Sequence, residues 1–147
     1  MRMSTVAVVS PTFLLAACQG DNPTGPSMQA AITVSVSPDP GTAEASSDPG
    51  FDWSVDFTVT IREIAGIGVA VDFVRVLSGD VTIDFDASDV IAAAGTNQIG
   101  PRGSLAVPLG IFYSAESGGR EIDANIEVQC TDNQGNVITR GVSWSAE

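Results

Sequence analysis

The stretch FDWSVDFTVTI, residues 51–61, constrains the fold more than any other part of the chain. All six odd-numbered positions in it are apolar, and all five even-numbered positions are polar. A strand places alternate side chains on opposite faces, whereas a helix would scatter these apolar residues around its surface. The pattern therefore predicts a strand with one buried face and one solvated face, as in an antiparallel sheet.

The same alternation recurs through the rest of residues 31–147. Its phase reverses at Phe73 and Val74, where a β-bulge would account for the change. One segment is predicted to form a helical turn, with Ser88 as the N-cap and Gly95 as the stop. Turn-forming Gly, Pro, Asn and Asp residues separate the remaining segments. The expected strands cover residues 32–36, 51–61, 69–76, 81–85, 105–113, 122–130 and 137–144.

About seven or eight short strands in residues 31–147 predict an all-β, antiparallel β-sandwich. With the closing stretch IDANIEVQCTDNQGNVITRGVSW, the pattern resembles the immunoglobulin-like and fibronectin-III-like domains of bacteria. The resemblance implies a spacer, an adhesion module or a ligand-binding platform. It does not imply an antibody-type domain, because the Cys…Trp…Cys spacing is missing and Val128 stands where a tyrosine corner requires Tyr.

The first 18 residues have the three parts of a secretory signal: a positive start, an apolar stretch and small residues before a cysteine. The apolar stretch is too short for a membrane-spanning helix, which needs about 20 residues. The residues Leu15-Ala16-Ala17-Cys18 resemble the bacterial lipobox. Two other interpretations stay open: a buried helix that ends in an ordinary cysteine, and a conventional signal peptide cut after Ala17.

The lipobox resemblance implies that Cys18 receives lipid and that a signal peptidase, recognising Leu15, Ala16 and Ala17, cuts before it. Residues 1–17 are then the signal peptide, and residues 18–30 carry the lipid and a flexible Pro- and Gly-rich linker. The mature protein is expected at the bacterial cell envelope, attached to a membrane by its lipid. Gln19, in place of Asp, favours the outer membrane in a Gram-negative cell.

The charge balance excludes several classes of function. Asp and Glu number 18, Lys and Arg number 6, and the formal net charge is −12. Such a surface repels phosphate backbones, so nucleic acid is not an expected partner. The chain has no His and no Lys, which removes the commonest catalytic bases and Schiff-base chemistry. We therefore expect neither an enzyme nor a cofactor.

Four acidic residues within ten positions, Asp80, Asp84, Asp86 and Asp89, are candidate calcium ligands. Their spacing does not match an EF-hand, and a solvated acidic face that discourages edge-to-edge aggregation is the alternative interpretation. Cys130 falls on the inward phase of its strand, which predicts a buried, unreactive thiol. An intermolecular disulfide through Cys130 is the alternative in an oxidising compartment.

The sequence as a whole favours a membrane-anchored envelope lipoprotein whose sandwich is a non-catalytic binding or structural module. The alternatives are a calcium- or carbohydrate-binding sandwich and a carboxylate-dependent hydrolase. A contact with an envelope protein or a glycan is expected at the longest stretches without strand pattern, residues 39–50 and 91–102. Phe112, on the outward phase of its strand, is a candidate for a binding patch.

The lipobox predicts that Cys18 is the site of lipid attachment. Labelled fatty acid given to the native cell should enter the wild-type protein and not the Cys18→Ser variant, because only a thiol can form the thioether. Immunoprecipitation followed by gel electrophoresis measures the incorporated label. Equal labelling of the two proteins would contradict the prediction.

Overall fold

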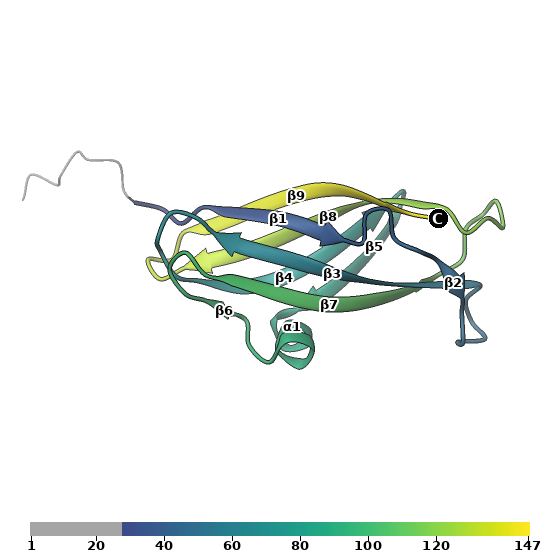
Figure 1. Ribbon diagram of the computed structural model, residues 1–147, viewed down its shortest axis with the longest axis horizontal. Helices are drawn as coiled ribbons and strands as arrows, with labels where there is room; N and C mark the ends of the chain where they lie inside the picture. The colour runs from purple at the N-terminus through teal and green to yellow at the C-terminus, as the bar shows by residue number, and fades with distance from the viewer. Residues whose placement is uncertain (1–27) are drawn as a thin grey trace, which may run out of the picture.

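The computed structural model describes residues 28–147, which form two antiparallel sheets packed as a sandwich (Figure 1). The described residues do not include the expected signal peptide with its Leu15, Ala16 and Ala17, nor Cys18, nor most of the linker. Ala30 already belongs to the fold, because it is buried and its N–H donates to Asp132 Oδ2 at 3.3 Å. No helix among residues 28–147 is long and apolar enough to cross a membrane.

The first sheet is built around β3 (Trp53–Glu63). On one side β3 pairs along its length with β7 (Ser104–Tyr113). Its other side is shared by β1 (Ile32–Ser37), which pairs near the C-terminal end of β3, and by the two-residue β2 (Glu44–Ala45), which pairs near its start.

The second sheet has β4 (Val69–Ser78) and β8 (Ile122–Asp132) at its centre. Beyond β8 lies β9 (Val137–Ala146), the C-terminal strand. The free side of β4 is shared by β5 (Val81–Asp86) and the two-residue β6 (Gln98–Ile99). The connections β3–β4 and β7–β8 cross between the sheets, and the isolated Gly41–Ala146 bridge links the segment after β1 to β9 in parallel.

The all-β, antiparallel β-sandwich predicted from the sequence is confirmed. Seven strands of six or more residues correspond to the seven alternating segments, and β2 and β6 are the two short additions. The bulge is also present, and its register shift lies between Val71 and Phe73. Asp72 is the extra residue there, and its Oδ2 accepts hydrogen bonds from Thr131 Oγ1 at 2.7 Å and Gln129 Nε2 at 3.3 Å.

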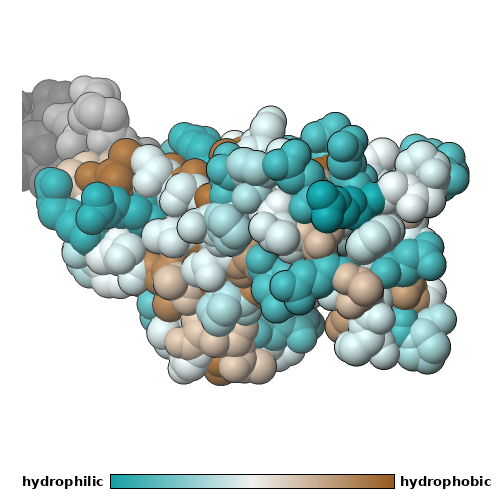
Figure 2. Space-filling model, turned by 45° about the vertical axis from the view of Figure 1, so that its right-hand side comes forward, coloured by the Kyte–Doolittle hydropathy of each residue, from teal (hydrophilic) through white to brown (hydrophobic). Residues whose placement is uncertain are grey.

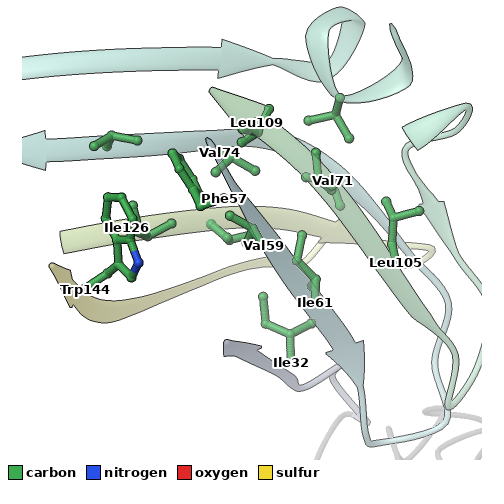
Figure 3. Close-up of a cluster of buried hydrophobic side chains, with 14 of the residues drawn as sticks. Ile32, Phe57, Val59, Ile61, Val71, Val74, Leu105, Leu109, Ile126 and Trp144 are labelled. Carbon is green, nitrogen blue, oxygen red and sulfur yellow. The ribbon is translucent and has the colours of Figure 1, made fainter. Parts of the chain in front are cut away.

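The alternation of β3 builds the middle of the core. Phe57 is only 3% exposed, and its ring packs against Trp144 with 4.7 Å between the centroids. Figure 3 shows Phe57, Val59 and Ile61 beside Val71, Val74 and Ile126 of the facing sheet.

Two aromatic residues at the start of the alternating segment are less buried than the alternation predicts. The prediction is wrong for Phe51 and partly met for Trp53. Phe51 is 44% exposed, because it belongs to the turn before β3, where its N–H donates to the carbonyl of Asp48 at 3.1 Å. Trp53, the first residue of β3 and expected to be buried, is half-buried.

The helix α1 (Ala87–Ala94) replaces the expected turn, and its cap differs from the prediction. Asp86, not Ser88, is the N-cap: its carboxylate accepts the N–H groups of Ser88 at 2.8 Å and Asp89 at 3.1 Å. The Asp89 carboxylate accepts the N–H of Asp86 in return, which completes a capping box. Gly95 ends the helix with φ 83°, as predicted.

The two long sides of the sandwich are closed differently. On one side β1 lies against β9, and Gly41 sits so close to the Trp144 ring that a Cβ there would come within 2.6 Å of it. On the other side the edge strands are β5 and β7, and α1 packs against both of them and against β4. Val90 of α1 is fully buried. We call this second side the β5–β7 seam; α1 fills only part of it.

Phe57→Ala should lower the free energy of unfolding by about 3–5 kcal/mol, because it removes a buried ring and leaves a cavity against Trp144. Urea denaturation of residues 28–147, produced without lipid or metal, measures this difference. The wild-type fragment should itself unfold cooperatively. A cost near zero would mean that β3 buries the opposite face.

Candidate functional site

A groove of about 660 Å³ lies at the end of the β5–β7 seam that α1 leaves unfilled. Its lining comes from the turn before β3, the β4–β5 hairpin, the end of β7 with the following loop, and the start of β8. Its volume falls within the range of about 300–1,000 Å³ typical of binding sites. Two smaller hollows, of about 470 and 300 Å³, lie elsewhere on the described residues.

Apolar side chains form the floor and part of the rim of the groove. Val76 and Ile111, both buried in the core, reach its floor, while Val81 of the edge strand is exposed at its rim. Phe51 and Phe112 each expose 44% of their surface and stack with 6.1 Å between ring centroids. The predicted exposure of Phe112 is confirmed, and the exposed Phe51 is its partner.

Hydrogen bonds hold the walls of the groove in place. The N–H of Asp52 donates to Ser114 Oγ at 3.0 Å, which ties the turn before β3 to the loop after β7. The Tyr113 hydroxyl donates to the carbonyl of Arg120 and closes that loop on itself. On the opposite wall, Ser78 Oγ donates to the carbonyl of Asp123 at 2.7 Å. The groove is therefore preformed.

Four carboxylates surround this apolar floor. Asp80, Glu116, Glu121 and Asp123 are exposed, and all four line the groove. No arginine lines it, and both ion pairs found among residues 28–147 use Arg75, on another part of the surface. The groove is therefore apolar inside and negatively charged at its rim.

On the face of the molecule drawn in Figure 2, hydrophobic residues occur in small groups among polar ones.

The four candidate calcium ligands do not converge. Asp84 pairs with Arg75, with 2.5 Å between Oδ1 and Nε, and this hydrogen bond lowers the pKa of Asp84. Asp86 and Asp89 cap α1, while Asp80 lies in the β4–β5 turn at the groove. Within residues 28–147, no group of three or more Asp, Glu, Cys or His side chains is arranged to hold a metal ion.

Cys130 is fully buried in β8, opposite Val71 of β4, in agreement with its inward phase. Burial raises the pKa of its thiol to about 12. The reactive thiolate is therefore scarce at neutral pH, which supports the interpretation of an unreactive core residue.

The opposite end of the sandwich holds two buried carboxylates that order loops. Burial alone would raise the pKa of Glu63, but hydrogen bonds lower it below its ordinary value. Its carboxylate accepts N–H groups from Ala65 at 2.7 Å and from Gly66 and Arg102 at 2.8 Å. A single side chain thus fixes the β3–β4 loop and the start of the turn into β7.

The carboxylate of Asp132 likewise orders the β8–β9 turn through hydrogen bonds. Burial opposes its ionisation, yet its hydrogen bonds lower its pKa to about 2. Oδ1 accepts the N–H groups of Gln134 and Asn136 at 2.9 Å, and Oδ2 accepts Asn136 Nδ2 at 2.9 Å and the N–H of Ala30. Asp132 therefore anchors the point at which the described chain enters the sandwich.

The loops expected to carry contacts are only partly those that build the groove. Residues 39–50 reach it through Gly50. Residues 91–102 do not line it, because they form the second half of α1, β6 and the turn toward β7. The loop after β7, which carries Glu116, was missed by the sequence analysis; its Ser117-Gly118-Gly119 run signals a turn but not its position beside β5.

Comparison with known proteins supports the fold and goes no further. No family model and no curated protein sequence matches the chain. A Northeast Structural Genomics Consortium target solved by X-ray crystallography is similar with a TM-score of 0.54 and 11% identity, over 80% of this chain and 85% of that one. A Bordetella pertussis protein provisionally named ApaA gives a TM-score of 0.51 and 14% identity, over 82% and 95%. At these identities the likeness shows a shared fold alone.

The lowered pKa of Asp132 predicts an acid-dependent loss of stability. A carboxyl group in the unfolded chain has a pKa of about 3.9, so the native state holds fewer protons between that pH and about 2. The stabilisation should be complete above about pH 5 and should be lost as the pH falls toward 2.

Urea denaturation as a function of pH measures this dependence. Asp132→Asn should be less stable at neutral pH and should lose part of the wild-type decline between about pH 5 and 2. Asn136→Ala, which removes one of the four hydrogen bonds to Asp132, should show a smaller effect in the same direction. Parallel stability curves for wild type and Asp132→Asn would contradict the assignment.

Proposed function

We propose that the chain is a lipid-anchored protein of the bacterial cell envelope whose β-sandwich is a non-catalytic binding module. Its binding site is the groove at the unfilled end of the β5–β7 seam. The observation that carries the proposal is the preformed groove itself, with exposed Phe51 and Phe112 stacked at its rim. Exposed aromatic rings beside a concave apolar surface are typical of binding sites.

The position of the groove fits a tethered module. The described chain begins at Met28, at the end of the sandwich where Ala30 bonds Asp132 and where β3 ends at Glu63. The groove lies at the other end, where β7 ends and β8 begins (Figure 1). A lipid on Cys18 would therefore hold the sandwich by one end and leave the groove at the far end, facing away from the membrane.

The available chemistry supports binding rather than turnover. The full chain lacks His and Lys, so a catalytic site would depend on carboxylates, Arg, Ser, Thr and Tyr113, with an acid drawn from the carboxyl groups. A general acid among them needs a raised pKa. Where the pKa of a described carboxyl group is clearly shifted, at Glu63, Asp84, Asp86 and Asp132, it is lowered.

Site-specific photocrosslinking in the native cell tests the proposal. A photoreactive phenylalanine analogue replaces Phe112 in the groove or, as the matched control, Ile64 at the opposite end. The two positions have similar exposure, 44% and 48%. The groove position should give a light-dependent adduct with an envelope component, and the control should not.

Both proteins must fractionate with the membrane for the comparison to hold, and Cys18→Ser should abolish that fractionation. Equal adducts from the two positions, or none from either, would contradict a binding site in the groove. A wild-type protein found entirely outside the membrane fraction would contradict the anchor.

A further inference from the structure

We infer that the ligand of the groove is an extended peptide segment of another protein, with alternating apolar and basic side chains. The inference rests on the proposed binding function and specifies its partner. Three features of the described residues support it: the apolar floor, the two strand edges on either side and the excess of negative charge at the rim.

The apolar floor requires apolar side chains in the ligand. The exposed Val81 and the half-buried Ile83 of β5 offer aliphatic surface above the buried Val76 and Ile111, and the Phe51–Phe112 pair adds an aromatic rim. Covering such surface stabilises a complex by roughly 25 cal/mol per Å² before the costs of association are counted. A purely polar ligand would not gain this stabilisation from apolar contact.

The strand edges favour an extended backbone. β5 forms its ladder with β4 alone and β7 with β3 alone, so each is the last strand of its sheet on this side. An edge strand presents unpaired N–H and C=O groups, and an added peptide strand satisfies them with main-chain hydrogen bonds. Side chains of that strand would alternate between the groove floor and the solvent.

The charge at the rim selects basic residues. Asp80, Glu116, Glu121 and Asp123 line the groove and form no ion pair within residues 28–147, and they outnumber Arg120, the chain neighbour of Glu121, whose positive charge reaches Tyr113. Their mutual repulsion falls when a cation approaches, and long Lys or Arg side chains reach such a rim while their apolar neighbours occupy the floor. The net charge of −12 adds a long-range attraction for the same kind of partner.

The same features disfavour a neutral sugar as the ligand. Sugar rings stack on flat aromatic faces, but Phe51 and Phe112 each turn one face toward the other. The carboxylates and serines of the lining can bond sugar hydroxyls, yet the apolar lining includes the aliphatic Val81, Ile83 and Ile122 and, among the described residues, no Trp. Aliphatic floor and strand edges match a peptide better.

Binding of three labelled hexapeptides to the full-length Cys18→Ser protein tests the inference by fluorescence anisotropy. One peptide alternates Lys and Val, the second alternates Glu and Val, and the third alternates Lys and Ser. The first should bind, and the other two should bind at least about tenfold more weakly, since each lacks one of the two complementary features. Raising the salt concentration should weaken the binding of the first.

Matched variants locate the interaction. Glu116→Gln with Glu121→Gln removes two charges from the rim and should weaken binding of the Lys–Val peptide about tenfold. Glu44→Gln with Asp56→Asn removes two exposed charges outside the groove and should leave it nearly unchanged. Phe112→Ala should weaken binding about tenfold, Ile64→Ala should not, and thermal melts should show all four proteins folded.

The outcomes separate this inference from the proposed function. Absence of Lys–Val binding up to about 1 mM, or equal binding of the Glu–Val peptide, overturns the inference. Binding of a neutral oligosaccharide such as cellohexaose at Phe112, without peptide binding, overturns it in favour of a sugar site. An adduct from position 112 in cells together with either result leaves the binding module standing with another ligand.

Discussion

The rest of the structure depends on the face that each strand can bury. β3 turns its odd-numbered side chains inward, and fully burying each Val, Ile or Phe stabilises the fold by roughly 1.5–3 kcal/mol. One sheet cannot cover that face by itself, so β4 and β8 must lie across it with their own apolar sides inward. The Phe57–Trp144 contact joins the apolar faces of the two sheets directly.

Two packed sheets have two open sides, and the groove follows from how differently these are closed. On the β1–β9 side, Gly41 lets the backbone press onto Trp144 and bridge to Ala146, and the hollow beside Trp144 is smaller, about 470 Å³. The β5–β7 seam is filled only over the length of one short helix, through Val90. Where α1 does not fill the β5–β7 seam, side chains of the core form the apolar floor of the groove. The neighbouring loops supply its acidic rim.

The sequence predicted what the alternation within a single strand determines and missed what turns and the pairing between strands determine. Alternation identified the strands and the bulge because strand geometry is local. Phe51 was assigned to the wrong face because the turn made with Asp48 shifts the start of β3. The proposed calcium cluster ignored Arg75, which the β4–β5 register places opposite Asp84. The groove could not be predicted, because β5 and β7 approach each other only in the folded molecule.

The carboxylates at the two ends of the proposed lipoprotein differ in role: those at the groove are exposed, and those at the opposite end are buried and hydrogen-bonded. From Cys18, residues 19–29 can span at most roughly 40 Å, and the eleven residues of β3 add about 35 Å between the entry point and the groove. Electrostatic interactions are screened within about 8 Å at physiological ionic strength, so a sandwich extended on this tether would hold its groove beyond repulsion from anionic headgroups. Its carboxylates can then attract a basic partner, while the ionised Glu63 and Asp132, held by backbone hydrogen bonds, order the loops at the opposite end.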